Sequence, residues 1–172
     1  LQYHWENRDY RSFDDFLGAL NSRKRKAVKK ERREVAELDI DIRVLSGREM
    51  TEDLWDAFFE FYMNTADRKW GQAYLTRQFF SLLGERCADD VVMVMAFEGG
   101  QPVAGALNFR GGDTLYGRNW GCSDDHKFLH FEACYYRAID YAIEHGLTRV
   151  EAGAQGQHKV QRGYLPTLTY SL

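Results

Sequence analysis

The sequence contains few cysteines and prolines and has no long hydrophobic run. Its three cysteines, Cys87, Cys122 and Cys134, form an odd set without a CxxC pair, which argues against a disulfide framework and favours a reducing compartment. No apolar run approaches the roughly 20 residues that a membrane helix requires. The chain also does not begin with the basic segment and apolar core of a signal peptide. We therefore expect a cytoplasmic protein without a membrane span.

The composition is that of a folded domain. Hydrophobic residues make up 44% of the 172 positions and aromatic residues 15%, which is enough material for a buried core. This length suits one domain, or one domain with an N-terminal extension, better than two full domains. Because the chain opens on Leu1 rather than on methionine, we expect that it is part of something longer.

Positive charge is concentrated near the N-terminus. The segment 23–33 reads RKRKAVKKERR, with eight basic residues and one acidic residue, Glu31, although the net charge of the chain is -3. One interpretation is a solvated helix, since most runs of charged residues form a solvent-exposed face. The other is a site for a phosphate-bearing partner, such as tRNA, a nucleotide-linked precursor or anionic lipid head groups. The candidate phosphate-binding residues are Arg23, Lys24, Arg25, Lys26, Lys29 and Lys30.

The hydrophobic pattern predicts an N-terminal helical basic extension over residues 1–38, followed by a domain over 39–172. A short helix begins after Ser12, and the basic helix covers about 22–38. Alternating residues 39–45 predict a strand, and apolar residues at helical spacing predict helices over about 51–69 and 75–85. The extension and the domain are therefore distinguished by composition.

The second half of the chain predicts an antiparallel meander and a crossover. The segments 91–98, 103–109 and 114–120 read as strands joined by Gly-rich turns. A helix over about 128–145 and a strand over 148–152 follow, and such a passage makes a right-handed parallel crossover. A short helix over 158–163 comes last. We expect an α/β (α+β) fold with a mixed, mostly antiparallel sheet flanked by helices.

This order of elements resembles the acyl-CoA N-acyltransferase fold of the GNAT superfamily over about residues 39–163. The resemblance implies that the strands 114–120 and 148–152 are parallel and splay apart around the acyl donor. Acetyl-CoA members carry a Gly-rich phosphate loop before the next helix. The matching stretch here, 121–127, reads GCSDDHK, with one glycine and two aspartates. Acetyl-CoA is therefore the less favoured donor.

Two motifs resemble the FemAB-like family, which is linked to peptidoglycan biosynthesis or recognition. They are SFDDFLGALNSRKRKAVKKERR and EAGAQGQHKVQRGYLP, and the resemblance spans nearly the whole chain. It implies an aminoacyl-tRNA-dependent transferase. Fem-type enzymes usually contain two GNAT-like domains, so this chain would correspond to the second domain. The missing domain would leave an apolar face, and association into a homodimer is a further expectation.

The resemblance also implies roles for residues of the C-terminal motif. It assigns Lys159 to oxyanion stabilisation and Arg162 to a phosphate or carboxylate clamp, although a surface lysine and arginine would give the same pattern. Glu151 would act as general base or orient an ammonium group, or be a structural carboxylate. His158, which replaces an aromatic residue of the Fem motif, is the third candidate catalytic residue. The other candidate substrate-binding residues are Arg118, Trp120, Glu132, Tyr135 and Gln155.

Cys122, His126, His130 and Cys134 recur every four residues, which puts them on one helical stripe. At most His126 and His130 could share a metal ion, because the whole stripe is about 18 Å long, and no convincing third ligand is nearby in the sequence. We therefore predict no metal site. Three functional hypotheses remain. The first is a Fem-like acyl or aminoacyl transferase acting on a small-molecule amine or a cell-wall precursor. The second is an acetyl-CoA-dependent N-acetyltransferase. The third is a non-catalytic module that binds tRNA or a phosphorylated polymer; DNA is not an expected partner.

Overall fold

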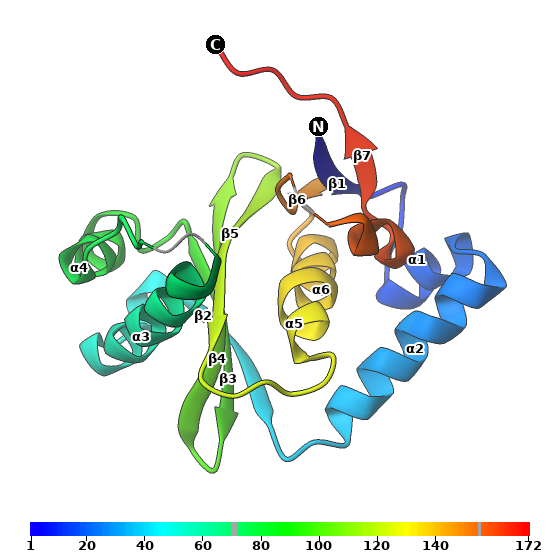
Figure 1. Cartoon of the computed structure of the whole chain (residues 1–172). Coiled ribbons are helices and arrows are strands. Elements are labelled where there is room, and N and C mark those ends of the chain that lie inside the picture. The colour runs from blue at the N-terminus through cyan, green and yellow to red at the C-terminus, as the bar shows by residue number, and fades with distance from the viewer. Residues whose placement is uncertain (70–71, 155) are drawn as a thin grey trace.

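The computed structural model describes residues 1–69, 72–154 and 156–172 and contains a seven-stranded sheet between two groups of helices (Figure 1). The strand order is β2-β3-β4-β5-β6-β1-β7. Every neighbouring pair is antiparallel except β5 and β6. The strands are β1 (Gln2–Glu6), β2 (Asp41–Ser46), β3 (Val91–Glu98), β4 (Gln101–Gly111), β5 (Thr114–Cys122), β6 (Arg149–Glu151) and β7 (Leu165–Thr167). The expected mixed, mostly antiparallel α/β fold is thus confirmed.

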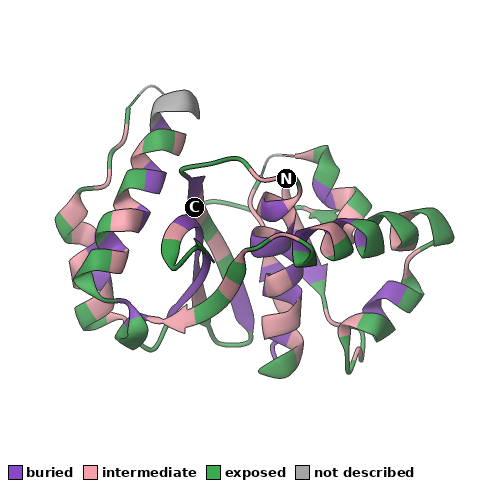
Figure 2. Cartoon of the chain, turned by 90° about the horizontal axis from the view of Figure 1, so that it is seen from below, coloured by how far each residue is buried: buried purple, intermediate pink, exposed green. Residues whose placement is uncertain are grey.

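One face of the sheet is covered by α3 (Glu52–Lys69) and α4 (Arg77–Arg86), which follow the short turn η1 (Gly47–Glu49) (Figure 1). Their apolar residues pack on β3 and β4, in a core that includes Trp55, Phe58 and Phe80. Strand β3 is buried on both faces through residue 97, as its unbroken apolar run predicts. Figure 2 shows how the buried residues follow the sheet and the inner sides of the helices.

A broken helix packs on the other face, and α1 (Phe13–Ala19) and α2 (Ser22–Ala36) lie on its outer side (Figure 1). The predicted helix over 128–145 consists of α5 (Leu129–Phe131), a π-helical turn η2 (Glu132–Tyr136) and α6 (Arg137–Glu144). A π-turn inserts an extra residue per turn and changes the direction in which side chains leave the helix. The predicted last helix is the 3₁₀ segment η3 (Gln157–Arg162).

The parallel strands separate after three residue pairs. Thr114, Leu115 and Tyr116 of β5 pair with Arg149, Val150 and Glu151 of β6. Beyond Tyr116, β5 continues to Cys122 and, among the described residues, pairs with β4 alone. The register of β4 against β5 shifts at the same level, where Arg118 is an extra residue opposite Leu107 and Asn108. Such a bulge bends a strand, so the expected splay opens between β5 and β6.

Residues 1–38 are less separate from the domain than we expected. Strand β1 lies inside the sheet between β6 and β7, and neither β1 nor β7 was predicted. The two helices begin where the sequence predicts, because the Ser12 and Asn21 side chains accept hydrogen bonds from the Asp15 and Lys24 N–H groups. The division into an extension, 1–38, and a domain, 39–172, therefore stays a prediction, and the sheet joins both parts.

Candidate active site

A cavity of about 560 Å³ lies where β5 leaves β6. It is bounded by residues from α3, β4, β5, η2 and the segment around η3. Five of the predicted site residues line it, namely Arg118, Trp120, Tyr135, His158 and Lys159. They come from three parts of the chain, and the splay of the parallel strands brings them together. We treat this cavity as the candidate active site.

Lys159 is buried at the end of β6. Its side chain is 7% exposed, and its Nζ donates a hydrogen bond of 2.6 Å to the backbone oxygen of Ala152. The ammonium also lies 5.7 Å from the ring centroid of Tyr3 on β1. Burying a cation requires such partners because the charge loses its hydration. The structure thus holds a positive charge at the wall of the cavity rather than on the surface.

Tyr135 and His158 form a hydrogen-bonded pair across the cavity. The Tyr135 hydroxyl and His158 Nε2 are 2.9 Å apart. Burial raises the pKa of Tyr135, Cys134 adds to the rise and Arg162 opposes it, so this phenol keeps its proton at neutral pH. Tyr164 is fully buried, and its hydroxyl donates a hydrogen bond of 2.9 Å to the Tyr135 backbone oxygen. The pair therefore has a fixed position and holds an exchangeable proton.

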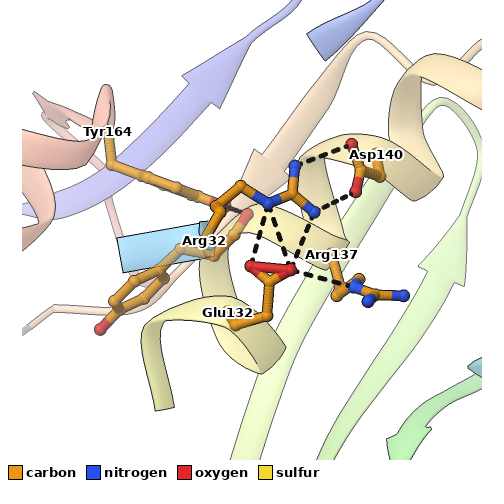
Figure 3. Close-up of polar contacts among 6 residues, drawn as sticks. Arg32, Glu132, Arg137, Asp140 and Tyr164 are labelled. Carbon is orange, nitrogen blue, oxygen red and sulfur yellow. Dashed lines mark hydrogen bonds and ion pairs between the residues drawn. The ribbon is translucent and has the colours of Figure 1, made fainter. Parts of the chain in front are cut away.

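Glu132, a predicted substrate-binding residue, does not line the cavity. Its carboxylate is buried and accepts hydrogen bonds from the Arg32 guanidinium, the shortest 2.9 Å long, and one of 3.2 Å from Arg137. Arg32 also donates to Asp140 at 2.7 Å. Figure 3 shows this network of two arginines and two carboxylates. Glu132 therefore joins α2 to the broken helix through its buried carboxylate.

Arg162 likewise lies outside the cavity and contacts the basic helix. Its guanidinium donates to both carboxylate oxygens of Glu31, at 3.0 and 2.8 Å, and to the His158 backbone oxygen at 2.7 Å. Glu31, the one acid of the basic segment, also accepts a hydrogen bond from the Tyr136 hydroxyl. Arg162 thus holds a carboxylate of its own chain and supports His158, the residue beside Lys159.

The Glu151 carboxylate contacts side chains of the sheet and does not line the cavity. Its two carboxylate oxygens lie 3.4 Å from His4 Nε2 and 3.3 Å from Arg149. Burial lowers the pKa of His4 more than Glu151 raises it, so His4 is neutral at pH 7. The contacts favour a structural carboxylate at this position. Gln155, another predicted substrate-binding residue, lies outside the described residues.

The basic helix α2 has two different faces. Val28, Glu31 and Val35 are buried against the domain, and Arg25 donates to the Leu17 and Leu20 oxygens at the end of α1. Of the six predicted phosphate-binding residues, four are exposed, and Lys24 and Arg25 are half-buried. The four exposed residues and Arg33, which is also exposed, form the outward cation stripe: Arg23, Lys26, Lys29, Lys30 and Arg33. None of these five forms an ion pair within the described part of the chain.

The acidic residues and histidines before and within α5 are the candidates for contacts with a cofactor or metal ion. Asp124 and Asp125 are exposed in the turn that precedes α5. His126 lies 3.7 Å from Glu98, whereas the His130 ring packs on Trp120, so the two histidines have different neighbours. In the described ranges, no three His, Cys, Asp or Glu side chains are grouped to bind a metal ion. Nor does any helix there have the length and apolar character needed to cross a bilayer.

Asn108 of β4 is a cavity residue that the sequence analysis missed. It is 2% exposed, and its amide group lies at the register shift between β4 and β5. Its one signal in the sequence is that it interrupts the apolar run of residues 103–109, VAGALNF. A polar residue inside a buried strand needs a partner or a ligand.

The FemAB-like family model, described as peptidoglycan biosynthesis/recognition, matches residues 1–172. Among solved structures, the chain is similar to FemX, with a TM-score of 0.68 and 12% identity over 95% of this chain and 58% of FemX. It is also similar to L-PGS from Bacillus licheniformis, with a TM-score of 0.65 and 11% identity over 96% of this chain and 56% of that one.

A third similar structure is the C-terminal domain of a putative lysylphosphatidylglycerol synthetase from Agrobacterium fabrum. It has a TM-score of 0.63 and 9% identity over 92% of this chain and 48% of that one. The chain therefore spans about half the length of these proteins, with which it shares the fold. No curated protein matches it.

Proposed function

Because this chain belongs to the FemAB-like family, we propose that it is an acyltransferase domain that passes an aminoacyl group to the amine of a cell-wall precursor. The observation that carries the proposal is the cavity between the splayed strands, where a buried lysine and a Tyr–His pair face one space. A cation stabilises developing negative charge, and a Tyr–His pair moves a proton. Acyl transfer from an ester to an amine requires both.

The chemistry follows from these positions. The amine nitrogen forms a bond to the ester carbonyl carbon, and the carbonyl electron pair becomes an oxyanion. We assign the Lys159 ammonium to this oxyanion, because a preorganised donor in a site sheltered from water contributes a few kcal/mol. When the oxyanion collapses, the ester C–O bond breaks. The proton lost by the amine passes through the His158–Tyr135 pair to the leaving oxygen.

The outward cation stripe of α2 supports aminoacyl-tRNA as the donor. Five cations without acidic partners in the described ranges are suited to a phosphate backbone. Acetyl-CoA is less favoured because Asp124 and Asp125 would repel its phosphates. The transfer takes place in the cytoplasm under this proposal, since charged tRNA is found there. Activity of this chain without a partner domain or a second copy is part of what the experiment tests.

A thermal-shift titration with acetyl-CoA, uncharged tRNA and aminoacylated tRNA identifies the donor. A ligand that binds only the folded chain stabilises it by about 2.7 kcal/mol at a hundred times its dissociation constant. We expect a shift with tRNA that is lost when Arg23 to Lys26 are neutralised. A shift with acetyl-CoA alone would instead make the protein an N-acetyltransferase.

A transfer assay then tests the catalytic assignment. Aminoacyl-tRNA labelled in the amino acid is mixed with Nα-acetyl-L-lysine amide as the amine, and the labelled product is counted. We expect Lys159→Met to lower the rate about 100-fold or more, and the surface variant Arg48→Gln to leave it unchanged. Wild-type rates for Lys159→Met would remove the oxyanion assignment.

The second candidate function is a non-catalytic module that binds a phosphorylated polymer through the stripe. The same outward cations favour it, because binding needs no cavity. Polyanion binding that survives Lys159→Met, together with no transfer by the wild-type chain, would support this module and contradict the transferase.

A further inference from the structure

We propose that Asn108 and Gly117 form a subsite that binds the attacking amine and directs its lone pair toward the acyl carbon. The proposal rests on the proposed function only in that the cavity holds the acceptor. No motif in the sequence points to these two residues. They lie opposite each other on β4 and β5, at the level where β5 separates from β6.

The orientation of the Asn108 amide is determined by its hydrogen bonds. Its Nδ2 lies 3.2 Å from the Val92 oxygen and 3.2 Å from the Ala106 oxygen. Both partners are backbone carbonyls, which only accept hydrogen bonds, so the nitrogen must face them and Oδ1 must face the other way. Asn108 is therefore held by two strands with its carbonyl oxygen pointing away from both. That oxygen accepts no hydrogen bond from any described residue.

Gly117 leaves room above this oxygen. A methyl group added at Gly117 would lie 3.5 Å from Asn108 Oδ1 and 3.2 Å from the Glu151 backbone oxygen. The backbone angle φ of Gly117 is not in the left-handed region, so its strand geometry does not require glycine. What the absent side chain does provide is a small space in the cavity wall beside Oδ1. The next residue, Arg118, is the bulged one, which turns the strand outward at this point.

The chemistry of the subsite favours a neutral N–H donor over an ammonium ion. Oδ1 is a neutral acceptor, so it binds an amine N–H without the strong preference for ammonium that a carboxylate would have. Arg118 and Lys159 in the same cavity disfavour an ammonium ion further. A neutral amine that donates one N–H to Oδ1 keeps its lone pair for attack. Asn108 is thus a binding residue for the reactive form of the acceptor.

Binding of two matched probes tests the subsite without any donor. Nα-acetyl-L-lysine amide carries a primary amine, and Nα-acetyl-L-norleucine amide has a methyl group in its place. Each is titrated at pH 9.5 into the isotopically labelled 172-residue chain, and the side-chain NH₂ signals of Asn108 are followed by NMR. We expect the lysine probe to shift these signals and the norleucine probe to leave them in place.

Two variants change the subsite from opposite sides. Asn108→Ala removes the oxygen, and Gly117→Ala fills the space beside it while keeping Asn108. Because one neutral hydrogen bond contributes about 0.5–1.5 kcal/mol, we expect each variant to bind the lysine probe about three- to tenfold more weakly. Gly111→Ala, at the far end of β4, is the matched control and should bind like the wild type. Thermal unfolding of all three variants checks that they fold.

The outcomes separate the subsite from the proposed function. Equal binding of the two probes, or wild-type affinity in both subsite variants, would overturn the subsite. If the probe binds as expected but no transfer is found with any donor, the subsite stands and the transferase proposal fails. If transfer is found and both variants transfer at the wild-type rate and KM, the transferase proposal stands and the subsite fails.

Discussion

Replacing Glu31 by glutamine tests how the basic helix is held against the domain. Glu31 is 8% exposed, and its carboxylate accepts two hydrogen bonds from Arg162 and one from Tyr136. Glutamine keeps the shape but removes the charge, and its NH₂ group would face the guanidinium. Breaking a buried ion pair by changing one partner costs about 3–5 kcal/mol, because the other charge stays buried without compensation. For a chain of this size that is a fall in Tm of about 6 to 20 °C.

The assay is thermal and urea unfolding of a double-mutant cycle. Glu31→Gln, Arg162→Gln and the double variant are compared with the wild type. Because the two side chains interact directly, the loss in the double variant should be smaller than the sum of the single losses. Lys30→Gln is the matched control, since its side chain is exposed on the same helix and should change stability by no more than about 0.5 kcal/mol.

The change should also reach the cavity. Arg162 donates to the His158 backbone oxygen, so a displaced guanidinium releases one support of the Tyr135–His158 pair. NMR signals of the His158 imidazole should therefore move in Glu31→Gln and stay in place in Lys30→Gln. If Glu31→Gln is no less stable than Lys30→Gln, or the coupling energy in the cycle is near zero, the reasoning from the buried pair is refuted.

Three further predictions concern the tyrosines, the stripe and the packing of α3. Burial raises the pKa values of Tyr135, Tyr136 and Tyr164 above 10.0, and Glu31 adds to the rise at Tyr136. Their contribution to the free energy of unfolding is therefore complete below pH 10 and falls above it, by up to about 1.4 kcal/mol per pH unit for each. As the pH is raised, the absorbance of tyrosinate should rise in two steps, and the second step should coincide with unfolding. A single step for all ten tyrosines would contradict this prediction. Changing the five cations of the stripe to glutamine should weaken the salt dependence of polyanion binding. The slope of log K against log salt concentration should become smaller by about 0.9 for each lost phosphate contact. An unchanged slope would contradict this prediction. Gly121→Ala should cost about 1–3 kcal/mol or more in urea unfolding, because its methyl group would overlap the Phe61 backbone oxygen. Gly18→Ala, whose methyl group would have no atom within 4 Å, should cost nothing. Equal losses in the two variants would argue against the close contact at Gly121.

The local patterns of the sequence predicted most of the fold. Strands β2 to β5, the helices α1 to α4 and the parallel crossover to β6 all lie where periodicity and turn residues placed them. Strands β1 and β7 were missed because they have only five and three residues, and their hydrogen bonds are to strands far away in the sequence. The π-turn of η2 was also missed, since the spacing of apolar residues over 128–145 fits an ordinary helix.

The candidate site shows the same division. The C-terminal motif identified Lys159 and His158, and the expected splay identified Arg118, Trp120 and Tyr135, all of which line the cavity. Glu132 and Arg162 are equally well marked in the sequence, but they form ion pairs within the chain and do not line the cavity. Their partners, Arg32 and Glu31, lie 100 and 131 residues away, so their pairing is invisible to any local pattern.

The sequence by itself therefore determined the order and kind of most elements, the family and the motif that supplies the lysine of the cavity, because each of these depends on neighbours along the chain. Only the tertiary structure decided which charged residues face the cavity and which neutralise one another in the interior. A buried charge must find its partner in space, and the partners of Glu31 and Glu132 are neighbours only after the basic helix has packed on the domain. The same packing turned Arg23, Lys26, Lys29, Lys30 and Arg33 outward.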